Sequence, residues 1–201
     1  MTKKIVDSPR ALQFKKIVGL AGFIGSGKST VAEFLIKKGF QHLRFSDPIE
    51  TEIKKRKLPL KRAVYQDIGD EWREKFGLDY ISKLLLAEAE KSTETHFVVD
   101  GFRNPGELPP FKSYPGFLLV GIYADQQLRF ERLRKRGLPR DPKTWGQFQE
   151  QEDRDLGIGQ PEFGQNNLAV FEAADILVIN RGKLAEVLAE VELVLQKKGI
   201  I

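Results

Sequence analysis

The chain has 201 residues, of which 41% are hydrophobic and 30% are charged, with a formal net charge of +5. This length and composition fit one α/β domain that buries a sizeable core without disulfides or other covalent cross-links. The absence of cysteine excludes disulfides, thiolate metal sites and cysteine nucleophiles. The longest apolar stretch, 117–124, is too short to span a membrane, and the polar start lacks the apolar centre of a signal peptide. We therefore expect a soluble, cytoplasmic protein.

Residues 17–30 contain the most specific signal in the sequence. An apolar run at 17–21 is typical of a buried strand, and G-x-x-x-x-G-K-[ST] follows it over 22–29. Apolar residues then recur at helical spacing, so the order is strand, glycine-rich turn and amphipathic helix. Backbone N–H groups and the positive end of the helix dipole would converge on one point. The stretch predicts a loop that binds the phosphates of a nucleoside triphosphate.

This motif assigns a role to each of its polar residues. We expect Lys28 to bridge the β and γ phosphates and Ser29 to bind Mg²⁺ through its hydroxyl. Thr30 would contact the α phosphate, unless it is an ordinary residue of the first helical turn. The rest of the predicted triphosphate site is the turn itself, which begins at Gly22 and in which the amides of Gly25, Ser26 and Gly27 hold the β phosphate.

Two carboxylates follow predicted strands further along the chain. A short strand at 42–45 leads into a turn containing Asp47, and the apolar run at 97–99 ends at Asp100. Ligands bind at the carboxyl ends of parallel strands, so both residues are candidates for orienting an accepting oxygen, and Asp100 also for holding Mg²⁺. The structural alternative for each is a turn or cap residue.

A helical stretch interrupted at Pro59 separates these two strands. It contains many basic residues, and Arg62 within it and Arg103 after the third strand could clamp a phosphate with bidentate geometry, with Arg73 a weaker candidate. The alternative for any one arginine is a solvated surface position. Because the basic residues gather in two blocks and do not follow one helix face, they favour a small anionic substrate over nucleic acid.

The second half of the chain begins with its most apolar strand. Residues 117–123 should lie centrally, buried on both faces, and a very basic helix follows over 125–136. A second helix at 147–156 and a Gly- and Gln-rich stretch at 157–165 suggest a movable flap. One helix face carries three arginines that could supply charge to a transferred phosphoryl group, or could simply be solvated: Arg129, Arg132 and Arg136.

The chain closes with a short helix at 167–174, a strand at 176–179 and an amphipathic helix over 184–195. Strands and helices alternate throughout. This order predicts a three-layer α/β/α fold around a five-stranded, doubly wound parallel sheet.

Five segments together resemble the nucleoside monophosphate kinase-like P-loop kinases, in particular the branch with dephospho-CoA kinase and deoxynucleoside monophosphate kinase. They are 22–30, 45–48, 99–107, 129–136 and 174–182. The resemblance implies a single kinase domain over 1–201 with three parts. These are a core (17–48, 96–124 and 166–197), an acceptor-binding insertion (49–95) and a lid (125–165).

The resemblance also implies roles for particular residues. Asp47 would stand where the family's acceptor-activating carboxylate lies, and Arg154 would be a second lid arginine. Asn180 and Gly182 would line the adenine of ATP. The 100–107 loop looks more like that of the deoxynucleotide enzymes than that of dephospho-CoA kinase.

The sequence thus predicts a kinase with ATP and Mg²⁺ as cofactors and a small nucleotide-like acceptor, most simply a nucleoside or deoxynucleoside monophosphate. Dephospho-CoA is the alternative acceptor. An alternative of another class is a nucleotide-dependent switch or binding protein without transfer activity, although 180–183 lacks the Asn-Lys-x-Asp pattern of a GTPase. The acceptor, the preferred base and the oligomeric state stay open.

Overall fold

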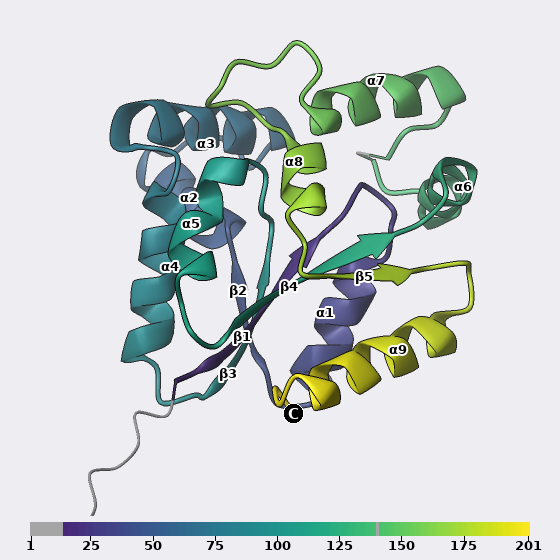
Figure 1. Ribbon diagram of the computed structural model, residues 1–201. Coiled ribbons are helices and arrows are strands. Elements are labelled where there is room, and N and C mark those ends of the chain that lie inside the picture. Colours follow the sequence, from purple (N-terminus) through teal and green to yellow (C-terminus); the bar gives the residue numbers. More distant parts are fainter. Residues whose placement is uncertain (1–13, 140) are drawn as a thin grey trace, which may run out of the picture.

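The computed structural model describes residues 14–139 and 141–201, except for the side chain of Arg62. Within them, a twisted sheet lies between helical layers (Figure 1). Its parallel strands run in the order β2-β3-β1-β4-β5. They are β1 (Lys16–Ala21), β2 (Gln41–Arg44), β3 (His96–Asp100), β4 (Phe117–Tyr123) and β5 (Ile176–Ile179). The predicted three-layer α/β/α fold with a five-stranded parallel sheet is confirmed.

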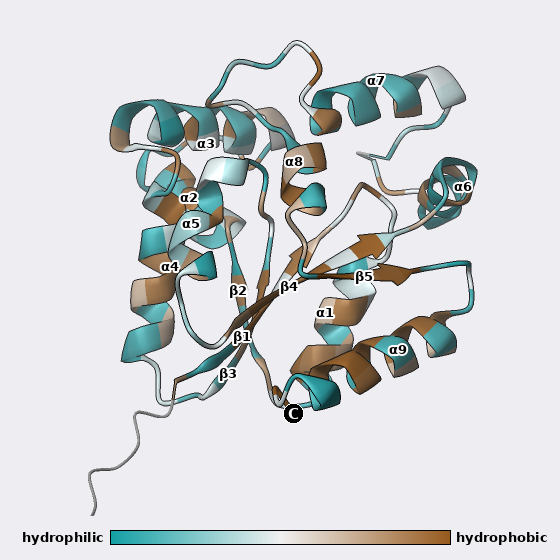
Figure 2. Ribbon diagram, in the orientation of Figure 1, coloured by the Kyte–Doolittle hydropathy of each residue, from teal (hydrophilic) through white to brown (hydrophobic). Residues whose placement is uncertain are grey.

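The middle strand of the sheet is β1, which pairs with β3 on one side and β4 on the other. The most apolar strand, β4, is interior but not central, because it lies between β1 and the edge strand β5. Successive residues of β1 point to opposite faces, so Val18 and Leu20 join one apolar cluster while Ile17 and Ala21 join another. The hydrophobic colouring of the strands in Figure 2 reflects this burial on both faces.

One face of the sheet is covered by α1 (Lys28–Lys37) and α9 (Leu184–Lys197). Val31 and Leu35 of α1 pack with Val187 and Val191 of α9 against the strands. This packing fixes the start of α1, and therefore the glycine-rich turn before it, at the carboxyl end of the central strand.

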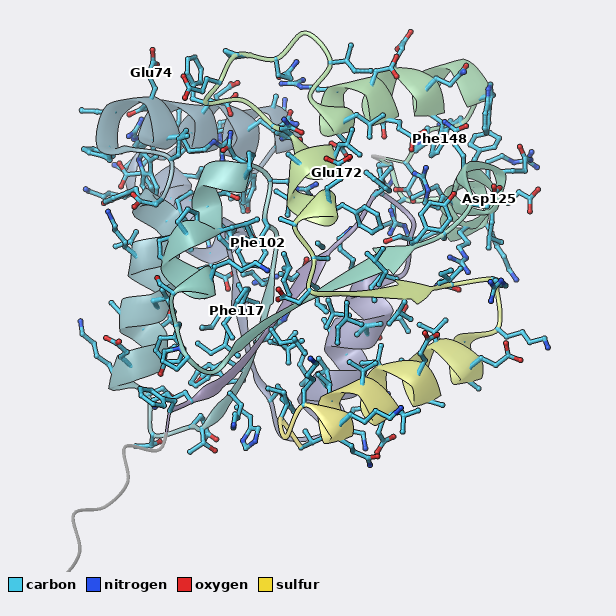
Figure 3. All side chains as sticks on the ribbon, viewed as in Figure 1. Glu74, Phe102, Phe117, Asp125, Phe148 and Glu172 are labelled. Atoms are coloured by element: carbon cyan, nitrogen blue, oxygen red, sulfur yellow. The ribbon has the colours of Figure 1, made fainter. Side chains whose placement is uncertain are left out.

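The opposite face is covered by a larger set of helices. They are α2 (Ser46–Lys55), α3 (Arg62–Phe76), α4 (Tyr80–Lys91), α5 (Pro109–Lys112) and α8 (Asn167–Glu172), with a 3-10 turn η1 (Pro105–Glu107) before α5. Phe102, Phe111 and Phe117 form an aromatic core beneath them, in which the ring centroids of Phe102 and Phe117 are 6.3 Å apart (Figure 3).

The predicted turn at residues 46–48 is instead the first turn of α2. Pro48 is tolerated in this first turn because the first N–H groups of a helix have no partner within the helix. The interruption at Pro59 is present as expected and separates α2 from α3. Arg62 begins α3, but its side chain lies outside the described part of the structure, as do residues 1–13 and Arg140.

The helices α6 (Gln126–Arg136) and α7 (Trp145–Leu156) form a separate small cluster beside the glycine-rich turn. Phe130 and Leu133 of α6 pack against Phe148 of α7; Phe148 is labelled in Figure 3. No helix in the described ranges is both long and apolar enough to cross a membrane.

A buried ion pair joins α6 to α7. Arg129 donates a hydrogen bond to Glu152, and both side chains are almost wholly buried. The guanidinium also lies 5.4 Å from the ring centroids of both Phe23 and Phe148. Arg129 is therefore a buried partner of Glu152 and not part of the charged face that the sequence predicts for the flap. A buried charge needs such a partner.

Replacing Glu152 with alanine should destabilise the protein by about 3–5 kcal/mol, because the substitution leaves the Arg129 charge buried without its partner. Chemical denaturation measures the change in the free energy of unfolding. Glu150→Ala, which alters an exposed residue of the same helix, should change that free energy by less than about 0.5 kcal/mol. Equal effects of the two substitutions would show that the ion pair does not hold α6 to α7.

Candidate active site

The glycine-rich turn forms a close-fitting cradle at the start of α1. Gly27 occupies the N-cap position with φ 110°, and no side chain caps the helix. A Cβ atom at Gly27 would lie 2.6 Å from Nδ2 of Asn180, and one at Gly22 would lie 2.4 Å from the carbonyl oxygen of Ile122. Only glycine fits these positions, so the turn keeps its backbone N–H groups available to an anion.

The ammonium group of Lys28 lies inside the turn. Nζ donates to the carbonyl oxygens of Gly22 and Phe23 at 2.6 and 3.0 Å. Burial lowers the pKa of Lys28 from 10.5 to about 8, although the nearby Asp100 carboxylate acts in the opposite direction. A phosphate group would bring negative charge to the ammonium and so favour its protonated form.

If the cradle binds ATP, as the loop motif predicts, the affinity for ATP should fall as the pH rises above about 8. Below that pKa, Lys28 is charged before ATP binds, whereas above it a proton must first be taken up, so the affinity drops about tenfold per pH unit. Calorimetric titration with ATP between pH 7 and pH 10 measures the dependence. The Lys28→Ala variant should bind weakly without this pH step, and a constant affinity in the parent would contradict the assignment.

Two cavities have Lys28 in their walls. The smaller has a volume of about 330 Å³ and is lined by residues 25–30 together with Arg132, Leu133, Arg136, Asn180, Gly182 and Leu184. The larger has a volume of about 700 Å³ and extends from the turn to the ends of β2 and β3 and to α2 and α3. Gly25, Lys28, Ser29 and Arg136 line both cavities, which therefore meet at these residues.

Asn180 and Arg132 brace the turn from the side of the smaller cavity. Asn180 donates from Nδ2 to the carbonyl oxygen of Ser26 at 2.8 Å and accepts from Nη2 of Arg132 at 2.6 Å. Arg132 also donates to the carbonyl oxygens of Gly25 and Ser26 at 3.3 and 3.4 Å. The Asn180 side chain, expected beside the adenine, thus lines the cavity while it holds the turn.

The wall of the larger cavity includes Asp100 at the end of β3. The strand register places Asp100 opposite both Leu20 of β1 and Arg44 of β2, at the carboxyl edge of the sheet. Ser29 lines the same cavity. Hydroxyl and carboxylate oxygens suit Mg²⁺, which commonly takes only one or two protein ligands beside water and phosphate oxygens. The two residues fit the metal that the loop motif implies.

Asp47 and Arg154 lie outside the lining of both cavities. The Asp47 carboxylate forms an ion pair with Arg44 at 2.6 Å and its side chain is 41% exposed. Arg154 is exposed on α7. The structure therefore does not place these two residues in the cavity wall that contains Lys28 and Asp100.

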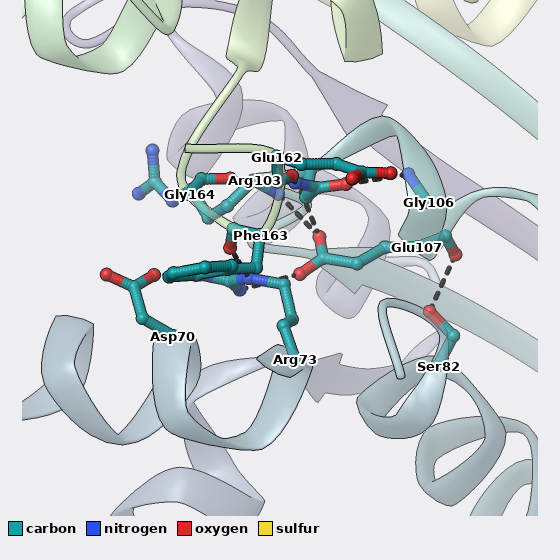
Figure 4. A network of polar contacts seen from close by, with 10 residues as sticks. Asp70, Arg73, Ser82, Arg103, Gly106, Glu107, Glu162, Phe163 and Gly164 are labelled. Carbon is teal, nitrogen blue, oxygen red and sulfur yellow. Dashed lines mark hydrogen bonds and ion pairs between the residues drawn. The ribbon is translucent and has the colours of Figure 1, made fainter. Parts of the chain in front are cut away.

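Arg73 and Arg103 line the larger cavity in different ways. Arg73 is buried and donates to Glu107 at 3.0 Å, to Asp70 at 2.5 Å and to the carbonyl oxygen of Phe163 at 2.6 Å (Figure 4). Its donors are committed to the protein, so it organises the cavity wall. The Arg103 side chain is 39% exposed, and its Nη1 lies 3.9 Å from Asp155 and 3.0 Å from the amide oxygen of Asn167. The exposed part of the guanidinium is open to a ligand.

The three arginines that the sequence places on one face of α6 have three different roles. Arg129 belongs to the buried pair with Glu152, and Arg132 braces the turn. Arg136 stands at the meeting point of the cavities, where Asp141 accepts hydrogen bonds from its Nε and Nη2 at 2.8 and 2.5 Å. The Asp141 carboxylate raises the pKa of Arg136, which therefore stays charged.

Sequence reasoning missed Glu107, Asp141 and Gln165, which line the larger cavity. For Glu107 a signal exists, since Asn104 and Glu107 have the spacing of a capping box, and the structure contains that box at η1. Asp141 and Gln165 occur in irregular segments, where local sequence does not indicate which way a side chain points.

With this geometry established, the chain can be compared with known proteins. Residues 18–157 match the family described as AAA domain. A UPF0200 protein of Thermococcus gammatolerans is 31% identical over 188 residues, which cover 90% of this chain and 94% of that protein.

Solved kinases have a similar fold. Shikimate kinase from Acinetobacter baumannii, solved in complex with shikimate, aligns with a TM-score of 0.55 at 19% identity, over 92% of this chain and 96% of its own. A gluconokinase from Sinorhizobium meliloti 1021 aligns with a TM-score of 0.52 at 20% identity, over 92% and 94% of the two chains. These likenesses concern the fold alone. By its relatives and by the domain matched over 18–157, the chain belongs to the UPF0200 proteins and contains an AAA domain.

Proposed function

We propose that this protein transfers the γ-phosphoryl group of ATP to a nucleoside or deoxynucleoside monophosphate. The observation that carries the proposal is that Lys28, Ser29 and Arg136 line both cavities. A triphosphate bound in the cradle of the smaller cavity would direct its γ phosphate to this meeting point. An acceptor in the larger cavity would approach the same point from the opposite side, as an in-line transfer requires.

The cations at the meeting point suit the chemistry of phosphoryl transfer. Charge spreads over the equatorial oxygens of the transferred group, and Lys28 and Arg136 would stabilise it there. Asp100 is the carboxylate that we assign to orienting the accepting oxygen, since it lines the larger cavity together with Lys28. Bound Mg²⁺, held by Ser29 and Asp100, would neutralise phosphate charge.

The lining of the larger cavity supports a nucleotide-like acceptor. Phe45, Ile49 and Ile81 offer an apolar wall for a base, and Gln66 adds a hydrogen-bonding group beside it. Arg103 supplies accessible donors for the acceptor's phosphate. In this proposal residues 49–95 form the acceptor-binding insertion and residues 125–165 form a lid, while ATP occupies the smaller cavity.

A transfer screen tests the proposal. The protein is incubated with Mg²⁺ and ATP labelled at the γ phosphate, together with each ribonucleoside and deoxyribonucleoside monophosphate and with dephospho-CoA. We expect label in one or a few nucleoside monophosphates. Label in dephospho-CoA alone would move the acceptor to the alternative, and tight ATP binding without transfer to any acceptor would favour a nucleotide-dependent switch.

A further inference from the structure

A buried amide in the wall of the larger cavity has an oxygen without a partner. Gln165 lines this cavity and is only 7% exposed. Its Oε1 atom is buried and accepts no hydrogen bond from any described residue. An amide oxygen in this state has lost its water without gaining a donor, which is unfavourable by about 1–3 kcal/mol. Such a group in a cavity wall indicates a ligand that supplies the missing donor.

The backbone on both sides of Gln165 is fastened to the rest of the cavity wall. The Gly164 carbonyl oxygen accepts from Nδ2 of Asn104 at 2.7 Å, and the Asn166 amide donates to the Arg103 carbonyl oxygen at 2.6 Å. One residue further back, the Phe163 carbonyl oxygen accepts from Nε of Arg73 (Figure 4). These bonds hold residues 163–166 against α3 and the loop after β3.

This anchoring fixes the backbone around Gln165 but leaves the bonds of its side chain free to rotate. A donor in the larger cavity would therefore gain the bond to Oε1 through a rotation of the side chain alone. An anchored backbone lowers the ordering that binding requires, which is a feature of a preorganised binding group.

The charged groups around the larger cavity differ in kind from Gln165, which with Gln66 is one of two neutral amides in the lining. Arg103 and Arg136 are cations, which recognise anions, and Asp100 is a carboxylate at the sheet edge. An amide is neutral and recognises a neutral polar group, such as a hydroxyl or an amino group. Gln165 therefore suits the part of an acceptor that lies away from its phosphate.

We propose that Gln165 is a specificity-determining residue of the larger cavity, whose Oε1 accepts a hydrogen bond from a neutral O–H or N–H group of the acceptor. The inference rests on the proposed function, because it takes the larger cavity as the acceptor site. For a nucleotide, the donor is either a sugar hydroxyl or an amino group of the base. Both sources present the same chemistry to the amide, and a set of matched acceptors distinguishes them.

The test compares the parent with Gln165→Met, which has a similar shape but offers no amide. The KM for the preferred acceptor should rise by about 10-fold to 100-fold, because the acceptor's donor is left without a partner, while the KM for ATP stays unchanged. The melting temperature should stay equal or rise, since a buried polar atom without a partner is replaced by an apolar one. A purely structural glutamine would give the opposite change in melting temperature.

Gln160→Met is the matched control, since Gln160 belongs to the same stretch of chain but does not line the larger cavity. It should leave both KM values at the parent level. Acceptor pairs then identify the donor group: monophosphates with and without the 2′-hydroxyl, with and without the 3′-hydroxyl, and with an amino or a keto base. The pair that the parent discriminates and Gln165→Met does not contains the group that the amide recognises.

Two results would overturn the inference. A Gln165→Met protein with the parent's KM for every acceptor would show that the amide makes no contact with the acceptor. A parent that transfers phosphate to several acceptors without discriminating within any pair would show that Gln165 determines no specificity. By contrast, a parent that binds ATP but transfers to no acceptor would overturn the proposed function itself, and the inference with it.

Discussion

Replacing Lys28 with alanine should reduce phosphoryl transfer by about a thousandfold, which is the largest effect that we expect from any single substitution. Lys28 lines both cavities, so its ammonium would contact the group in transfer throughout the reaction. Steady-state transfer with the best acceptor measures the loss. Lys37→Ala, at the exposed end of the same helix, is the matched control and should leave the rate unchanged.

The Lys28→Ala protein should nevertheless fold. The substitution leaves the carbonyl oxygens of Gly22 and Phe23 without the ammonium that they accept from. The lowered pKa of Lys28 shows that its charged form is less favourable in the folded protein than in the unfolded one. Burying that charge therefore lowers the free energy of unfolding, fully so below pH 8, and the substitution removes this penalty. The two effects oppose each other, so circular dichroism should show a folded variant. Near-parental turnover in that folded variant would contradict the kinase proposal.

Arg136→Ala should lower kcat by about a hundredfold, with a much smaller change in the affinity for ATP. Arg136 stands where the two cavities meet, and Asp141 orients its guanidinium through Nε and Nη2. Its charge would therefore act mainly on the phosphoryl group in transit. Single-turnover kinetics at saturating ATP separate this effect on chemistry from an effect on binding.

Arg134 is the internal control for this prediction. It belongs to the same helix, but its guanidinium lies 5.9 Å from the ring centroid of Phe130 and lines neither cavity. Arg134→Ala should keep kcat within a few-fold of the parent value. If both alanine variants lost activity equally, α6 would act as a general basic surface, and the specific role of Arg136 would be wrong.

The phosphate loop could be predicted from sequence because its signal is local. Gly22, Gly25 and Gly27 are required by backbone conformation, and Lys28 and Ser29 follow at a spacing that the turn itself imposes. The parallel sheet could be predicted for a related reason. Apolar runs such as 117–123 need burial on both faces, and this burial follows from alternating strands and helices.

The assignment of each charged side chain could not be predicted in the same way. Arg129, Arg132 and Arg136 share one helix face in the sequence, yet each finds a different partner: Glu152 of α7, Asn180 after β5, and Asp141 in a loop. The cost of leaving a charge buried depends on which segments pack against it, and those segments are distant in the chain.

The sequence by itself determined that this protein has a phosphate loop on a parallel sheet, because glycine conformation, helix periodicity and strand burial act over a few neighbouring residues. Only the tertiary structure decided which of the two predicted carboxylates lines the larger cavity: Asp100 does, and Asp47 does not. It also decided that Gln165 lines the same cavity as Asp100 and Arg103. Such contacts join residues far apart in the chain, and packing, not local propensity, brings them together.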